Sequence, residues 1–182
     1  MMRRLPAVLL AGLLSVAPTT AHAQFSTSLS VAGGLSVPLQ ELADRGDAGY
    51  NAALGVSFGA PLVPFGVRLE AGVNGFTGKS TGLLTFTDTR IFTGTANATL
   101  AMGSLASSPY LIAGVGAYRR QFVADAGTSS SRTAGGFNAG AGFRFPLGNI
   151  STFVEARYHQ MLGNATDGTN YRFVPVTFGI NF

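Results

Sequence analysis

Two features of the sequence could carry hydrolytic chemistry. Gly55-Val56-Ser57-Phe58-Gly59 matches the G-x-S-x-G pattern of a nucleophile elbow, which exposes a Ser hydroxyl where a strand turns sharply into a helix. Here the pattern lies inside an alternating apolar and polar segment, so we interpret Ser57 as a small inward residue. His159 could act as a base or a metal ligand, but no Ser lies beside it and no second His follows residue 22. We therefore expect no catalytic, metal-binding or cofactor-binding residue, and a hydrogen-bonding role for His159.

Strands would position these side chains, because apolar and polar residues alternate from Phe25 almost to the last residue, Phe182. A period of two is typical of a β-strand with one face buried. Turn-forming residues divide the alternation into eight predicted strands, each of about 9–13 residues. The segment from Tyr110 to Phe122 is apolar on both faces, so its pattern does not indicate which face points inward.

The connections between the predicted strands alternate in length. The long, polar ones are Pro38–Tyr50, Thr77–Thr89, Val123–Gly135 and Gly163–Asn170. The short ones are Ala60–Phe65, Gly103–Pro109 and Pro146–Ile150. This alternation predicts an all-β fold, an eight-stranded antiparallel up-and-down barrel with its long connections at one end. Transmembrane barrels have this asymmetry, with short periplasmic turns and longer outer loops.

The composition of the two strand faces indicates which one is outside. The polar face is rich in Gly, Ala, Ser, Thr and Asn, and Lys79 is the only Lys in the chain. Small residues fit the narrow interior of an eight-stranded barrel, whereas a solvated face normally carries many charged residues. The apolar face carries five aromatic residues: Phe58, Phe92, Phe143, Tyr158 and Phe178. We therefore predict a closed transmembrane β-barrel with its apolar face toward lipid, rather than a soluble barrel.

Five charged residues fall on the inward face. They are Arg68, Glu70, Arg144, Glu155 and Arg157. If the N-terminal end is periplasmic, strand direction places all five in the periplasmic half of the lumen. An isolated buried charge is very costly, whereas paired charges are tolerated. We expect one connected ion-pair network that plugs the lumen. The alternative is an ion-selective constriction, but eight strands leave no room for a wide channel.

The first 23 residues match a secretory signal peptide. A basic start, an apolar run from Leu5 to Ala17 and the small-residue pattern Ala21-His22-Ala23 predict cleavage after Ala23. The apolar run is shorter than the roughly 20 residues of a membrane-spanning helix. We expect residues 1–23 to be removed and residues 24–182 to form the barrel domain.

Composition excludes several further classes. The chain has no Cys, so it has no disulfide framework, thiolate metal site or cysteine nucleophile. Its formal charge of +4 includes Arg3 and Arg4 of the leader, and the remaining charge is too balanced to indicate a nucleic-acid partner.

These features resemble the small eight-stranded outer-membrane proteins of Gram-negative bacteria, the OmpA/OmpX/opacity-protein superfamily. In that family the outer-membrane assembly machinery reads a terminal aromatic residue with apolar residues two and four positions before it. Phe182, Ile180 and Phe178 match this signal. Pro175 departs from the pattern, because proline removes a ladder donor, and it predicts a local bulge. The resemblance implies a porin-like protein of the cell outer membrane, in contact with outer-membrane lipid, and we expect a monomer.

Three functions are compatible with the sequence. The first is a non-enzymatic role of the outer loops in surface interaction or envelope integrity, with an external ligand that the sequence does not name. The second is a narrow pore for ions or small solutes. The third is an outer-membrane lipid hydrolase that uses His159. We favour the first, because the residues needed for catalysis are missing around His159 and the predicted lumen is narrow.

Overall fold

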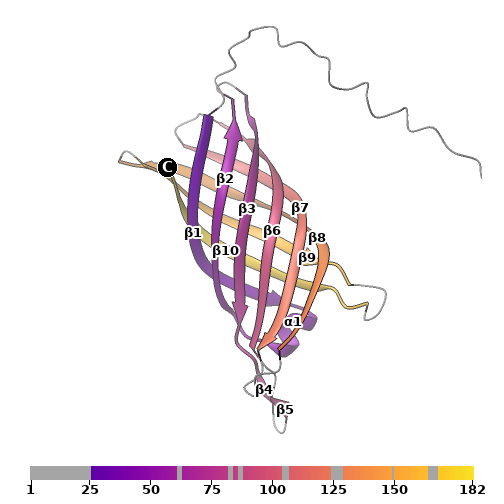
Figure 1. Ribbon diagram of the computed structural model, residues 1–182. Coiled ribbons are helices and arrows are strands. Elements are labelled where there is room, and N and C mark those ends of the chain that lie inside the picture. Colours follow the sequence, from indigo (N-terminus) through magenta and orange to yellow (C-terminus); the bar gives the residue numbers. More distant parts are fainter. Residues whose placement is uncertain are drawn as a thin grey trace, which may run out of the picture.

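The computed structural model describes residues 26–60, 63–81, 84–85, 88–103, 107–123, 129–148, 150–163 and 168–182. The predicted signal peptide lies outside these residues. Eight strands close into one barrel in the order β1-β10-β9-β8-β7-β6-β3-β2, and every neighbouring pair is antiparallel (Figure 1). The predicted all-β, eight-stranded up-and-down barrel is therefore confirmed.

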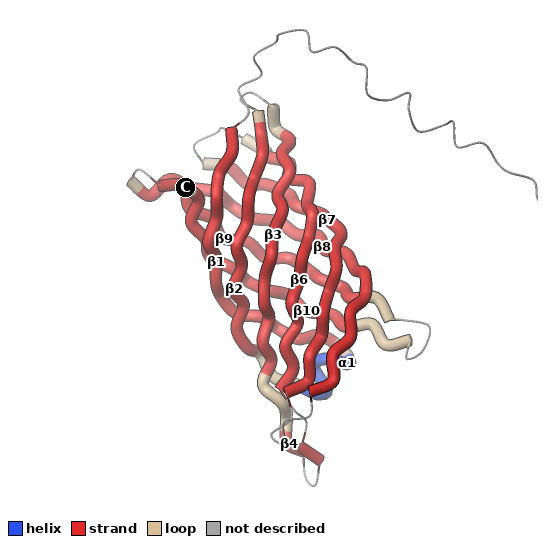
Figure 2. The backbone as a smooth tube through the Cα atoms, in the orientation of Figure 1, coloured by secondary structure: helices blue, strands red, loops and turns tan. Residues whose placement is uncertain are grey.

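The barrel strands are β1 (Ser26–Leu39), β2 (Gly49–Gly59), β3 (Phe65–Phe76), β6 (Asp88–Ala101), β7 (Ser108–Val123), β8 (Ser129–Leu147), β9 (Ile150–Met161) and β10 (Tyr171–Asn181). Three shorter elements lie in the first two long connections: helix α1 (Glu41–Arg45) and the two-stranded sheet of β4 (Ser80–Thr81) and β5 (Leu84–Thr85). Figure 2 shows these elements at one end of the barrel, which we call the long-connection end. The opposite end, which holds the C-terminus, is the short-turn end. No helix among the described residues is long and apolar enough to cross a membrane.

Closure joins the two ends of the chain. The register of β1 and β10 is continuous from the pair Ser30 and Asn181 to the pair Leu39 and Arg172. Leu29 and Phe182 extend it, because the N–H of each donates to the carbonyl of the other, at 3.1 and 2.8 Å. Neither β1 nor β10 is left as an open edge, as a strand in hydrocarbon requires.

The predicted bulge at Pro175 is wrong. On the β1 side Pro175 pairs with Ser36 in unbroken register. On the β9 side the register is the same from Phe173 with His159 to Val176 with Ala156, so no residue has been inserted. Proline costs the ladder a donor toward one neighbour, and the pairs on both sides of it hold the strand in place.

The third long connection is shorter than predicted. We expected a loop over Val123–Gly135, but β8 begins at Ser129 and pairs with β7 as far as Val123. The segment has polar residues on both faces, so its pattern resembled a loop. Pairing with β7 satisfies its backbone groups and extends the hairpin.

The structure also shows which face of β7 points inward, which its sequence did not indicate. Its inward residues include Tyr110, Ile112, Tyr118 and Arg120, all buried, whereas Leu111 and Val115 are exposed on the outer surface. Orientation follows from register with β6 and β8, where each β7 residue faces the same way as its partner.

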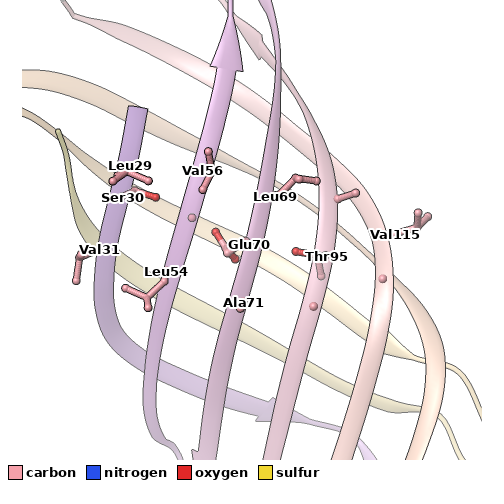
Figure 3. A pocket seen from close by; sticks show the side chains of 14 residues that line it. Leu29, Ser30, Val31, Leu54, Val56, Leu69, Glu70, Ala71, Thr95 and Val115 are labelled. Atoms are coloured by element: carbon pink, nitrogen blue, oxygen red, sulfur yellow. The ribbon is translucent and has the colours of Figure 1, made fainter. Parts of the chain in front are cut away.

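The outer surface of the barrel is apolar, as predicted. Leu54, Leu69 and Val115 are between 48% and 66% exposed, whereas Arg68, Asn97 and Glu155 are at most 2% exposed. Figure 3 shows part of this surface across the neighbouring strands β1, β2, β3, β6 and β7, with a shallow groove of about 740 Å³. An exposed apolar surface of this extent suits hydrocarbon rather than water.

Candidate functional site

The lumen contains a layer of ion pairs that spans its full width. Arg68 on β3 donates to Glu155 Oε2 on β9 at 2.9 Å, and Arg157 Nε lies 2.6 Å from Glu155 Oε1. Arg157 also pairs with Glu70 on β3. Strands β3 and β9 are opposite each other in the ring of eight. These four side chains, which we call the ion-pair layer, therefore bridge the barrel from wall to wall.

The side chains of this layer are all buried. The Arg68 and Glu155 side chains are 2% and 1% exposed, and those of Arg157 and Glu70 are 5% and 8% exposed. Tyr110 completes the layer by donating a 2.7 Å hydrogen bond to Glu155 Oε2. The Arg68 guanidinium also lies over the rings of Tyr110 and Phe153, at 5.6 and 5.1 Å from their centroids. Charge pairing and ring contacts of this kind reduce the cost of removing water from charged groups.

Arg144 does not join the ion-pair layer, contrary to our expectation of one network of five charges. It forms no ion pair within the described part of the chain, and its guanidinium lies 5.6 Å from the centroid of the Tyr110 ring. The reason is register. Arg144 is opposite Phe153, whereas Glu155 is opposite Gly142, one inward position further from the short-turn end. The stabilising role that we assign to the other four charges stays a prediction.

Next to this layer, toward the long-connection end, His159 is buried in the lumen. Its Nδ1 is 3.0 Å from the Tyr118 hydroxyl, its ring stacks on Phe173 with centroids 5.0 Å apart, and its Nε2 is buried without a hydrogen-bond partner. A chamber of about 20 Å³ adjoins it, with room for about one water molecule. The described residues contain no group of three or more His, Cys, Asp or Glu that could hold a metal ion.

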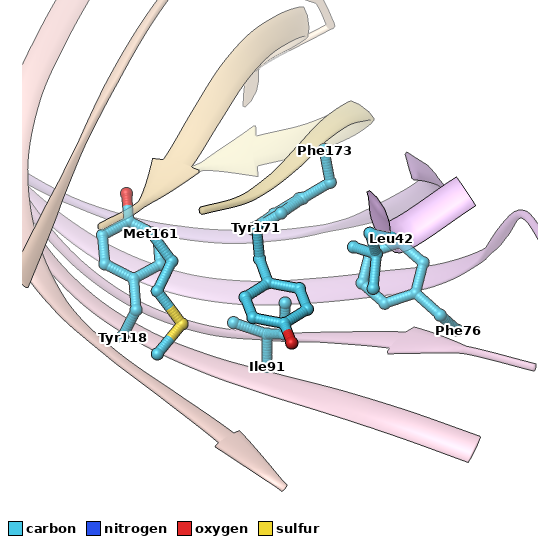
Figure 4. Close-up of a cluster of buried hydrophobic side chains, with 7 residues drawn as sticks. All are labelled: Leu42, Phe76, Ile91, Tyr118, Met161, Tyr171 and Phe173. Carbon is cyan, nitrogen blue, oxygen red and sulfur yellow. The ribbon is translucent and has the colours of Figure 1, made fainter. Parts of the chain in front are cut away.

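The long-connection end of the lumen is filled by an apolar cluster that the sequence analysis missed. Its members are Leu42, Phe76, Ile91, Tyr118, Met161, Tyr171 and Phe173 (Figure 4). Leu42 belongs to α1, so the first long connection folds back over the mouth of the barrel and contributes to the cluster. Phe76, Ile91 and Phe173 are at inward positions of their strands, and this could have revealed the cluster. Most other inward positions carry small polar residues, so the few large apolar ones were overlooked.

The sequence analysis also missed the inward charge of Arg120, because β7 could not be oriented. It is 7% exposed and its guanidinium lies 4.0 Å from the centroid of the Tyr171 ring and 4.4 Å from that of Phe122. It is near the long-connection end, well separated along the strands from the ion-pair layer. Ring contacts of this kind stabilise a cation that has lost part of its water.

The short-turn end of the lumen is open. A cavity of about 720 Å³, which we call the vestibule, begins at this end and extends inward to Arg68, Tyr110 and Arg144. Its wall carries polar groups from five strands: Ser28, Ser57, Thr99, Ser151 and Asn181. Ser57 of the G-x-S-x-G pattern is thus a vestibule residue within β2, without the strand-to-helix turn that a nucleophile elbow requires.

The three residues of the predicted assembly signal lie on the outer face of the closing strand. Phe178 and Phe182 are 47% and 68% exposed, and Ile180 has the same parity. Their recognition by the assembly machinery stays a prediction.

Comparison with known proteins gives the fold. No protein-family pattern matches this sequence, and no curated protein sequence does so. Among solved structures, Neisserial surface protein A (NspA) is similar with a TM-score of 0.65 at 15% identity, over 86% of this chain and 97% of that one. A major outer membrane protein from Thermus thermophilus has a TM-score of 0.55 at 14% identity, over 86% of this chain and 99% of that one.

The class of protein follows from these observations. The chain has the fold of the small eight-stranded outer-membrane β-barrels, as its resemblance to that superfamily implied. The apolar belt would be exposed to water in any other setting. Fold and surface together place the protein in the outer membrane.

Proposed function

We propose that this protein is a plugged outer-membrane barrel that acts through the surface at its long-connection end, in surface interaction or envelope integrity. The observation that carries the proposal is the ion-pair layer, in which Arg68 and Glu155 meet across the lumen from opposite strands. A barrel whose interior is occupied by paired side chains presents only its two ends and its lipid face to other molecules. Its long connections are the larger polar surface.

The architecture of the first two long connections supports this assignment. A bridge joins Gly46 to Gly78, and the Asp47 N–H donates to the Thr77 carbonyl at 2.9 Å. Lys79 donates from its backbone to the Arg45 carbonyl at 3.0 Å. These bonds hold the two connections together, so they form one shaped surface, which is what recognition of a partner requires.

A pore is less well supported. Ions would have to pass the ion-pair layer, the chamber beside His159 and the apolar cluster in turn. Moving any of the four paired charges aside would leave an unpaired charge in a confined interior. Planar-bilayer recordings of the folded protein test this point. We expect no discrete conductance steps, and steady conductance at moderate voltage would favour the pore.

A lipid hydrolase is also less well supported, because His159 Nδ1 contacts the Tyr118 hydroxyl and Nε2 is buried without a hydrogen-bond partner among the described residues. Hydrolysis would need an activated Ser or water within hydrogen-bond reach of the base. Lipid analysis of outer membranes with and without the protein tests this. We expect identical lipid profiles, and lipid products that disappear in a His159→Ala strain would overturn the proposal.

The positive test uses a strain that lacks the protein. It should show increased envelope permeability or reduced surface adhesion, and the intact chain should restore the lost property. Four further variants each replace one long connection by a Gly/Ser segment of equal length, and their folding is checked by heat-modifiable migration on a gel. We expect at least one folded variant to fail in restoring the property. Full restoration by all four would remove the assignment to the long-connection surface.

A further inference from the structure

The proposed surface role does not use the vestibule at the short-turn end, a cavity of about 720 Å³ that is lined by both polar and apolar residues. We propose that the vestibule binds a small oxyanion, a phosphate or a carboxylate, through Arg144. The argument starts from charge. The five inward charges that the sequence predicted are three arginines and two glutamates, and the structure shows where the surplus positive charge lies.

Both glutamates are already engaged. Glu155 contacts Arg68 and Arg157, and Glu70 contacts Arg157. Arg144 is the member of the set without a carboxylate, and it lies on the vestibule wall. The charged side chains among the described residues that line the vestibule are Arg68 and Arg144, both positive. Because Glu155 compensates Arg68, the net charge of the side chains that line the vestibule is the single positive charge of Arg144, and a cavity with low-dielectric walls concentrates small ions of the opposite sign.

A second observation concerns the inner end of the vestibule. Arg68 also lines the vestibule, and its guanidinium, paired with Glu155, lies at the end that Arg144 approaches through the shared Tyr110 ring. Arg144 has no carboxylate partner among the described residues, so its guanidinium is the group that an acceptor in the vestibule could reach. An oxyanion offers several acceptor atoms in one small group, and it matches the forked geometry of a guanidinium better than a single water does.

The remaining wall suits such a ligand. Hydroxyl groups of Ser28, Ser57, Thr99 and Ser151 surround the cavity from four strands and can donate to oxygen atoms. Phe65 and Ile150 add apolar surface that could accommodate a short hydrocarbon substituent. The volume of about 720 Å³ falls within the usual range of small-molecule sites, about 300–1,000 Å³. Because the ion-pair layer closes its inner end, the vestibule is a binding site with one entrance.

The source of the oxyanion is either a free solute or the headgroup of a lipid beside the short-turn rim. Two probes distinguish them: inorganic phosphate, and monomeric dihexanoyl phosphatidylglycerol. The folded protein is kept in a maltoside detergent, which carries no phosphate or carboxylate, at fixed ionic strength so that screening does not change. Binding is followed through the backbone amide NMR signals of Ser28, Ser151 and Asn181.

We expect saturable shifts of these signals with at least one probe. Tighter binding of the lipid would identify a headgroup site, and equal or tighter binding of phosphate a solute site. Arg144→Gln should weaken binding about tenfold or more, because a charged hydrogen bond is lost. Arg144→Lys keeps the positive charge but loses the paired donors of the guanidinium, so this variant should bind the probe with intermediate strength.

Arg132→Gln is the matched control. Arg132 is on the same strand with the same inward parity, but near the long-connection end. It should bind both probes as the unaltered protein does, and heat-modifiable migration should show that all variants fold. Shifts that do not saturate with either probe would overturn the proposal. So would equal affinity of the Arg144→Gln variant and the unaltered protein.

Discussion

The ring of Tyr110 lies over Gly142, its partner on the neighbouring strand β8. A Cβ placed on Gly142 would be 2.8 Å from Cε1 of that ring, closer than real side chains approach one another. Gly136 makes the same kind of room for Tyr118, where an added Cβ would be 2.7 Å from Cε2. The inward glycines of β8 thus provide the space that the large side chains of β7 occupy in a narrow lumen.

Gly142→Ala should therefore destabilise the barrel. The added methyl group must push Tyr110 away from the Glu155 carboxylate, and overpacking of this kind costs about 1–3 kcal/mol. Gly135→Ala is the control, because Gly135 is on the same strand and an added Cβ meets nothing within 4 Å. Urea unfolding in detergent, followed by the gel mobility of the folded band, measures both. If the two variants unfold at the same urea concentration, the space at residue 142 does not matter.

Glu155→Ala should lower the free energy of unfolding more than any single change at an exposed carboxylate. The substitution leaves Arg68 without its carboxylate partner and removes one of the two carboxylates that contact Arg157. Breaking a buried pair typically costs about 3–5 kcal/mol, and less if water enters. Asp44→Ala in exposed α1 is the comparison, with an expected effect near zero. The same urea assay applies. Equal stability of the two variants would mean that the ion-pair layer contributes little.

Phe182→Ala should reduce insertion into the outer membrane in cells. The substitution keeps the two backbone hydrogen bonds with Leu29, so a defect would report on the exposed aromatic side chain that the resemblance identifies as part of the assembly signal. Phe92→Ala removes an aromatic ring that is 41% exposed elsewhere on the outer face and should insert normally. The amount of heat-modifiable protein in the outer-membrane fraction measures insertion. Equal yields from the two variants would argue against a signal at Phe182.

The long-connection end should face the cell exterior. A tag between Ser129 and Ser130, at the start of β8 and the outermost pairs of its hairpin with β7, should be labelled on intact cells, whereas a tag at Gly148, in a short turn, should be labelled only after lysis. Three outward arginines near the long-connection end, Arg90, Arg119 and Arg172, suit contact with anionic headgroups. Labelling of intact cells at Gly148 alone would invert this orientation, and the vestibule would then open to the exterior.

Much of the fold could be predicted from the sequence, because strand formation and parity are local properties. Successive side chains of a strand point to opposite faces, so the pattern alone placed Phe178 outside and Arg68 and Glu155 inside. The length of the connections likewise indicated an up-and-down barrel. Where local patterning was weak the prediction was weak too, as in β7, with two apolar faces, and in the first residues of β8, with two polar ones.

In the strands with a clear alternation the sequence alone determined which residues face the lumen, and only the tertiary structure oriented β7 and decided which inward residues meet. Arg68 and Glu155 are 87 residues apart, and they pair because closure sets β3 opposite β9. Arg144 also points inward and carries the same charge as Arg68. Register places it opposite Phe153, so it lines the vestibule and does not join the ion-pair layer. Leu42 reaches the apolar cluster because its connection folds back over the mouth of the barrel. Contacts across a lumen depend on closure and register, which are set by all eight strands together and are not encoded in any one of them.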